Sequence, residues 1–134
     1  MLITGTFLDE ISHDIPHQNW GPLEWEKDFV HMKNAGIDTV ILIRSGYRSF
    51  LTYPSPYLLQ HRNCYTPPLD LVGLFCTLAD RYHMKFYFGL YDSGHYWDTG
   101  DMKEEIELNR FVVDEVWSRY GHHPSFQGWY LSME

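Results

Sequence analysis

Ionisable side chains follow each of four apolar, strand-like segments. In chain order they are Asp9 and Glu10, then Arg44, then Tyr91, Asp92 and His95, and finally Glu134. If the segments are parallel strands, their carboxyl ends meet at one rim, where the catalytic groups of (β/α)8 barrels cluster. A partly buried carboxylic acid at such a rim can act as a general acid. The spacing therefore predicts a candidate catalytic site at the ends of the strands.

Glu134 is the strongest candidate for a catalytic group because it follows the apolar stretch 128–131. The alternative is a solvated glutamate. Arg44 could orient a sugar hydroxyl or hold a carboxylate through its planar guanidinium group. Alternatively, it could form a salt bridge that closes the rim. Asp9 and Glu10 could bind hydroxyls, or they could serve in a loop or a helix cap.

Aromatic side chains are concentrated in two segments that follow strands. They are Tyr47, Phe50, Tyr53, Tyr57 and Tyr65 in residues 44–66, and Tyr91, Tyr96 and Trp97 in residues 91–101. Rings with polar tips can pack on the apolar faces of sugars and still donate hydrogen bonds. Long loops that pack on themselves are the alternative. The predicted substrate-binding residues are Asp9, Glu10, Arg44, Tyr47, Tyr91, Asp92, His95 and Trp97.

No metal or cofactor site is predicted. His13, Asp14 and His17 include metal-ligand types, but Pro16 breaks the helix that would place both histidines on one face. The segment after the first strand lacks the GxGxxG pattern of dinucleotide-binding folds, and no P-loop occurs. The two cysteines form no CxxC pair, and Cys76 lies on the apolar face of a predicted helix, where we expect a buried free thiol.

Strands and helices alternate along the chain. Periodicity predicts strands at 2–8, 38–43, 84–90 and 127–133, and helices at 22–35, 67–83 and 102–120. The segments after strands are long and those after helices are short, as in barrels whose site is built from the βα loops. We therefore expect an α/β fold of parallel (β/α) units, the first half of a (β/α)8 barrel, rather than a doubly wound sheet. Residues 1–134 form one domain in this interpretation. A full barrel needs about 250 residues, so we expect either a fragment or a partner that completes the fold.

The composition argues against some classes of binding partner. The chain has a net charge of −8, from 18 acidic and 10 basic residues, which argues against nucleic acid or an anionic membrane surface. No apolar run approaches the roughly 20 residues that span a bilayer. The first residues lack the basic start and apolar stretch of a signal peptide. A neutral ligand fits this charge best.

Several stretches together resemble a known family. They are ITGTF at 3–7, WEKDF at 25–29, MKNAGIDTV at 32–40 and GWYL at 128–131, followed by Glu134. In these stretches the chain resembles the N-terminal half of the DUF4434 family, glycoside-hydrolase-like TIM barrels common in gut Bacteroides. The resemblance implies a carbohydrate substrate and a periplasmic or secreted protein.

The layout is also similar to clan A of the retaining glycoside hydrolases. In that clan an arginine ends strand two, an Asn-Glu pair ends strand four, and a nucleophilic glutamate ends strand seven. Arg44 and Glu134 match the first two positions, but Ser132 and Met133 precede the glutamate in place of the asparagine. We therefore expect a glycoside hydrolase with Glu134 as the general acid/base. The alternatives are a carbohydrate-binding barrel without catalysis, and an assembly module that pairs through its open half barrel.

Overall fold

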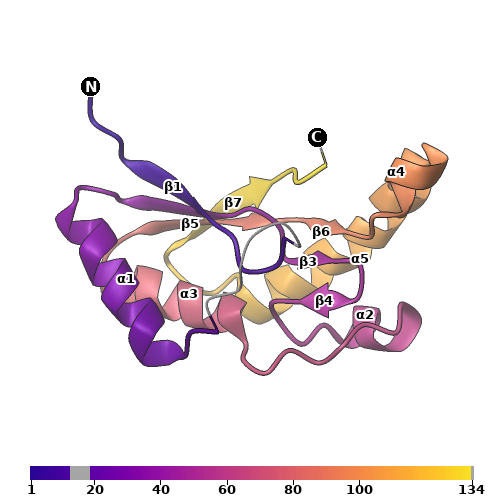
Figure 1. The fold of residues 1–134 in the computed structure, drawn as a ribbon, viewed down its shortest axis with the longest axis horizontal. Coiled ribbons are helices and arrows are strands. Elements are labelled where there is room, and N and C mark those ends of the chain that lie inside the picture. Colours follow the sequence, from indigo (N-terminus) through magenta and orange to yellow (C-terminus); the bar gives the residue numbers. More distant parts are fainter. Residues whose placement is uncertain (13–18, 134) are drawn as a thin grey trace.

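In the computed structural model, which describes residues 1–12 and 19–133, four parallel strands form the main sheet. In spatial order they are β1 (Gly5–Leu8), β2 (Thr39–Leu42), β5 (Lys85–Gly89) and β7 (Phe126–Tyr130). Spatial order follows chain order. The three long helices, α1 (Pro22–Asn34), α3 (Leu71–Arg81) and α5 (Met102–Tyr120), connect successive strands on one side of the sheet (Figure 1). A doubly wound sheet would reverse its order and carry helices on both faces. The prediction of a half barrel is therefore confirmed.

Most predicted elements are present with shifted ends. Strand β1 begins at Gly5 and β7 ends at Tyr130, so the predicted strands 2–8 and 127–133 were too long at their outer ends. The predicted helix 67–83 was also too long, because α3 begins only after Asp70, whose Oδ1 accepts a hydrogen bond of 3.0 Å from the Gly73 amide. Such an N-cap satisfies an amide that has no partner within the helix.

Sequence patterns missed five short elements. A second, three-stranded sheet consists of β3 (Gly46–Tyr47), β4 (Phe50–Leu51) and β6 (Tyr91–Asp92), in the order β4-β3-β6. The short helices are α2 (Pro56–His61) and α4 (His95–Thr99). All five lie in the segments expected to be loops, beyond the carboxyl ends of β2 and β5 (Figure 1). Two-residue strands are too short to produce a recognisable alternation of apolar residues.

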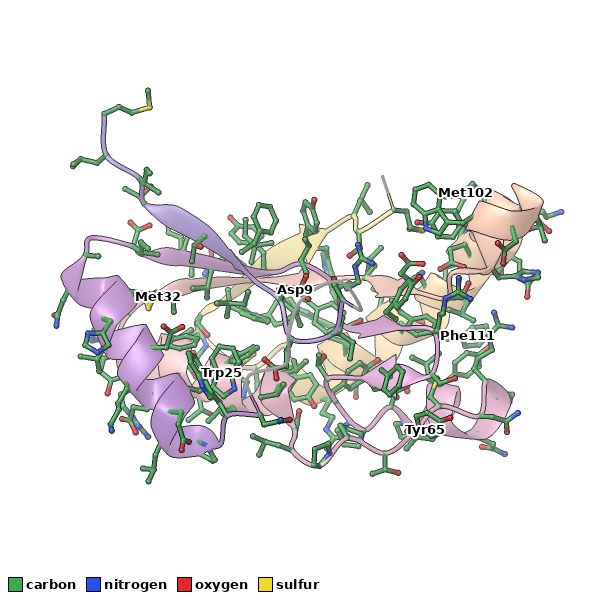
Figure 2. The ribbon with its side chains drawn as sticks, in the orientation of Figure 1. Asp9, Trp25, Met32, Tyr65, Met102 and Phe111 are labelled. Carbon is green, nitrogen blue, oxygen red and sulfur yellow. The ribbon has the colours of Figure 1, made fainter. Side chains whose placement is uncertain are left out.

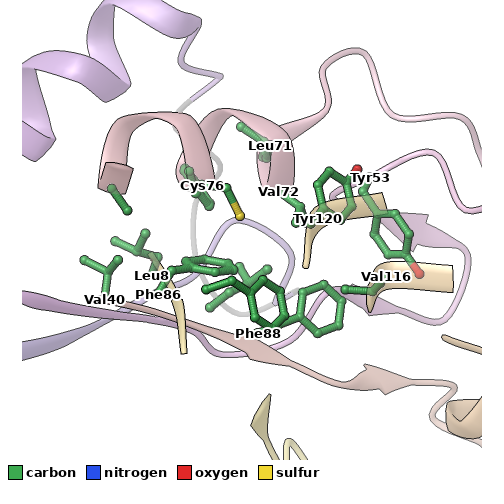
Figure 3. Close-up of a cluster of buried hydrophobic side chains, with 14 of the residues drawn as sticks. Leu8, Val40, Tyr53, Leu71, Val72, Cys76, Phe86, Phe88, Val116 and Tyr120 are labelled. Carbon is green, nitrogen blue, oxygen red and sulfur yellow. The ribbon is translucent and has the colours of Figure 1, made fainter. Parts of the chain in front are cut away.

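The core lies between the sheet and the helices. Val40, Phe86 and Phe88 project from the strands onto Val72 and Cys76 of α3, all fully buried (Figure 3). Each such apolar side chain contributes about 1.5–3 kcal/mol by leaving water. Cys76 is a buried free thiol, as predicted. Within residues 1–12 and 19–133, no helix combines the length and apolar character needed to cross a membrane.

The opposite face of the sheet is concave. Phe7 on one edge strand and Tyr130 on the other bring their rings within 5.2 Å, although two strands separate them. The sheet is therefore strongly curved, as a closed barrel requires. Phe7 and Leu131 are largely exposed. Self-association through this open face stays a prediction.

Gly89 lets β5 pass close to β2. A Cβ at this position would lie 2.0 Å from the Leu42 carbonyl oxygen, whereas a Cβ at Gly5 would lie no closer than 3.7 Å to any neighbour. We expect Gly89→Ala to lower the free energy of unfolding by about 1–3 kcal/mol through overpacking. Gly5→Ala, the control in the same sheet, should change it by less than about 0.5 kcal/mol. Urea unfolding of both variants checks this, and equal stability would contradict the close approach.

Candidate active site

The carboxyl ends of the four strands are joined by hydrogen bonds. The Ile43 amide donates to the Leu8 carbonyl at 3.0 Å, and the Leu90 amide donates to the Tyr130 carbonyl at 3.1 Å. The buried Ser132 hydroxyl lies 2.6 Å from the Ile43 oxygen and 3.0 Å from the Leu90 oxygen. The residues that follow the strands are therefore held in fixed positions relative to one another.

Arg44 and Asp92 form an ion pair at this rim. Their Nη1 and Oδ2 atoms are 3.5 Å apart, and the side chains are 23% and 1% exposed. The second carboxylate oxygen of Asp92 accepts a hydrogen bond of 2.8 Å from the Gly94 amide. Of the two roles left open for Arg44, the structure shows the salt bridge. Because breaking such a pair leaves a buried charge unsatisfied, both side chains are held in place.

The Tyr47 ring packs against two guanidinium groups. The Cζ atoms of Arg44 and Arg48 lie 5.4 Å and 5.3 Å from its centroid, within the range of cation–π contacts. Its hydroxyl also accepts a hydrogen bond of 3.1 Å from Arg48 Nε. Tyr47 therefore links the ion pair to the next turn of the chain.

Tyr96 and Trp97 form an aromatic pair beside the ion pair. Burial raises the pKa of Tyr96 to about 12, and the negative charges of Asp92 and Glu105 act in the same direction. The phenol therefore stays neutral, and its buried hydroxyl has no hydrogen-bond partner among the described residues. Trp97 is 59% exposed, with its ring centroid 4.9 Å from that of Tyr96. A large exposed ring beside polar groups has the character of a sugar-stacking surface.

Two other residues that were predicted to bind substrate, Tyr91 and His95, lie away from the Arg44–Asp92 pair. Tyr91 is buried, its hydroxyl donates to the Arg48 carbonyl, and burial raises its pKa. His95 is exposed, and its Nε2 is 3.8 Å from a Glu104 carboxylate oxygen. Neither residue contacts the Arg44–Asp92 pair through a hydrogen bond among the described residues. Their contact with substrate stays a prediction.

Asp9 and Glu10 occupy different surroundings. Asp9 Oδ1 accepts hydrogen bonds from the Ile11 amide at 3.1 Å and the Ser12 amide at 2.9 Å, so this carboxylate shapes the turn after β1 (Figure 2). For Asp9 the structure thus shows the second of the two roles considered from the sequence, that of a loop residue. Glu10 instead lines a groove of about 710 Å³, whose other walls include Trp20, Phe50 and Tyr65. Binding of hydroxyls by either carboxylate stays a prediction.

Some sequence candidates lie outside the described residues. They are Glu134 and the group His13, Asp14 and His17. Within residues 1–12 and 19–133, no three histidine, cysteine or acidic side chains are placed to hold a metal ion.

Helix α5 supports the site through residues that sequence analysis missed. Asn109 is buried and holds both polar groups of the Tyr91 peptide, accepting from its amide at 3.0 Å and donating to its carbonyl at 2.9 Å. Glu105, 2% exposed, accepts hydrogen bonds from the Ser93 amide at 2.9 Å and from the Ser93 hydroxyl at 2.5 Å. Asp92 lies between these two anchored residues. The available signal was a polar pair, four residues apart, on the otherwise apolar inner face of the predicted helix.

Comparisons with known proteins agree with this fold. The model of the family described as "Domain of unknown function (DUF4434)" matches residues 3–134, which confirms the predicted resemblance. No curated protein matched. The crystal structure of a "putative alpha-L-fucosidase" from Bacteroides thetaiotaomicron is 68% identical, with a TM-score of 0.94 over 98% of this chain. This chain spans only 41% of that structure's length.

More distant structures show the fold alone. They are an alpha-L-fucosynthase and an alpha-fucosidase in complex with fucose, both from Thermotoga maritima. Each is 20% identical to this chain, with TM-scores of 0.54 and 0.53 over 77% and 76% of it. The chain covers 26% and 27% of their lengths.

The bridge between Asn109 and Tyr91 yields a stability prediction. Asn109→Ala leaves a buried amide and a buried carbonyl without partners, so the free energy of unfolding should fall by about 2–4 kcal/mol. Asn34→Ala, at an exposed position at the end of α1, should change it by less than about 0.5 kcal/mol. Urea unfolding measures both, and similar values for the two variants would show that the bridge does not hold the segment.

Proposed function

Because this chain belongs to the DUF4434 family, we propose that it forms one half of a glycoside-hydrolase barrel that cleaves an O-glycosidic bond in a neutral glycan. The observation that carries the proposal is the cluster at the carboxyl ends of β2 and β5. Arg44 and Asp92 form an ion pair there, Tyr96 lies near Asp92, and the exposed Trp97 ring packs on Tyr96. Polar groups that fix orientation next to an apolar stacking ring are the usual contents of a sugar site.

An α-L-fucosyl residue is the substrate that we propose. The 68% identical structure is described as a "putative alpha-L-fucosidase", and its first part superposes closely on this chain. Fucose carries no charge, which suits a chain with a net charge of −8.

Glu134 is the general acid/base in this proposal. It follows Ser132, which is hydrogen-bonded at the ends of β2 and β5, by two residues in the chain. Arg44, held by Asp92, would donate to substrate hydroxyls, and Trp97 would stack on the sugar ring. A retaining mechanism needs a second carboxyl group about 5–5.5 Å from the first. By analogy with clan A, that group would come from a seventh strand, which this half barrel does not contain.

Binding without catalysis is the second candidate. Met133 stands directly before Glu134, where clan A has asparagine, and it lines an apolar cleft with Leu131. A methionine at this position lacks the amide group that could donate a hydrogen bond. This candidate predicts saturable glycan binding with no released sugar.

Replacing Glu134 tests the proposed hydrolysis. In the full-length protein that contains this chain, Glu134→Gln should reduce hydrolysis of an aryl α-L-fucoside and of fucosylated glycans by about 10²–10⁴-fold, the usual contribution of a general acid. The control Glu107→Gln changes an exposed carboxylate on α5 and should leave the rate unchanged. Wild-type turnover by Glu134→Gln would exclude the proposed role. Glycan binding without released sugar in the unmodified protein would favour the binding module.

Replacing the stacking ring tests the sugar surface under both candidates. Trp97→Ala should weaken glycan binding at least about tenfold, which corresponds to about 1.4 kcal/mol. Trp117→Ala removes an equally exposed indole on α5 and serves as the control. Titration calorimetry measures both affinities. Equal affinities for the two variants would show that Trp97 does not contact the glycan.

A further inference from the structure

We propose that the chain carries a second binding site, a cavity that holds an oxyanion group: sulfate, phosphate or carboxylate. The cavity has a volume of about 510 Å³ and lies outside the Arg44–Asp92 cluster, between the end of α2, the segment after β6 and the start of α5. Its ionisable lining residues are Arg48, His61, Arg62, His95 and Glu104, with Tyr91 beside them. The volume is within the usual range for small-ligand pockets. The assignment goes beyond the proposed hydrolysis and does not depend on it.

Two arginines and two histidines are gathered in this cavity of a chain that is acidic overall. The whole sequence has a net charge of −8, and among residues 1–12 and 19–133 the two arginines and two histidines of the cavity share its lining with one carboxylate, Glu104. Two further carboxylates lie close enough to Arg48 to act on it electrostatically, the exposed Asp98 and the ion-paired Asp92. A guanidinium group in a concave surface attracts anions, and its planar fork matches the spacing of two oxyanion oxygens.

The backbone of the cavity wall adopts an uncommon conformation. Arg48 and Asn63 have φ angles of 54° and 53°, in the left-handed region that few non-glycine residues adopt. Arg48 is held there from both sides. Its amide donates to the Asp92 carbonyl at 2.9 Å, and its carbonyl accepts from the Tyr91 hydroxyl and from the Cys64 thiol. Conformations maintained by several surrounding contacts in this way are concentrated at ligand-binding sites.

The Arg48 side chain is positioned as firmly as its backbone. A Cβ at Gly94 would lie 3.0 Å from Arg48 Cζ and Nε, so the guanidinium packs into the space that this glycine leaves. Nε donates to the Tyr47 hydroxyl at 3.1 Å. No other side-chain hydrogen bond of Arg48 occurs within the described residues, which leaves its terminal amino groups for a ligand.

Glu104 shows how an oxyanion sits in the cavity. One carboxylate oxygen is 3.3 Å from Arg62 Nη1, and the other is 3.8 Å from His95 Nε2. The side chain is 46% exposed and can therefore rotate into solvent. Glu104 is thus a weakly held competitor for the same cations, and an incoming anion would displace it.

The experiment titrates the full-length protein that contains this chain by calorimetry at low ionic strength, where the attraction is least screened. The probes are inorganic sulfate, inorganic phosphate, galactose 6-sulfate and uncharged galactose. Arg48→Gln and Arg62→Gln should each weaken anion binding at least about tenfold, because each removes charge-assisted hydrogen bonds. Arg110→Gln removes an exposed arginine that is paired with Glu107 outside the cavity, and it should bind anions as the unmodified chain does. Arg62→Gln leaves the left-handed Arg48 backbone untouched and keeps the test valid if Arg48→Gln fails to fold.

A variant that should tighten anion binding, rather than weaken it, completes the test. Glu104→Gln removes the competing charge and should tighten anion binding several-fold, whereas Glu107→Gln should not. Tighter binding of galactose 6-sulfate than of inorganic sulfate would assign the site to a charged glycan, and equal binding would assign it to a free anion. The proposal is overturned if no anion binds saturably, if Arg110→Gln weakens binding as much as Arg62→Gln, or if Glu104→Gln fails to tighten it.

Discussion

The parallel pairing of β2 with β5 is the interaction on which both sites depend. The two strands approach closely where Gly89 meets the Leu42 carbonyl, and the pairing resumes beyond the main sheet between β3 and β6. This second ladder aligns Tyr47 with Asp92. Next to this ladder Arg44 meets Asp92, and Arg48 lies against Gly94. A shift in register would separate both pairs at once.

Helix α5 fixes the outer end of this ladder with polar groups in its buried face. Asn109 holds the Tyr91 peptide and Glu105 holds Ser93, so Asp92 is positioned between two anchored neighbours. Buried polar groups of this kind add little net stability when satisfied but cost much when a partner is lost. They therefore specify one arrangement of the segment, which is what a preorganised site needs.

The surroundings of Arg44 and of Arg48 differ in how the positive charge is balanced, and they suit different ligands. Around Arg44 the cation is neutralised by the buried Asp92, and the exposed Trp97 offers an apolar surface suited to an uncharged sugar. Arg48 and Arg62 share their cavity with the half-exposed Glu104, which can turn away into solvent. Salt should therefore affect the two sites differently, because screening weakens exposed charges far more than buried pairs.

The sequence alone determined the order of the strands, their parallel pairing and the inner faces of the long helices, because apolar periodicity records which side of an element is buried. It also located the rim, since the ends of parallel strands must share an edge. Only the tertiary structure decided which ionisable groups pair with which. Arg44 is bound to Asp92, Asp9 is bound to its own turn, and Arg48 lies with Arg62 across a cavity. These contacts depend on how the loops fold, and loop conformation depends on hydrogen bonds and left-handed turns that produce no periodic pattern in the sequence.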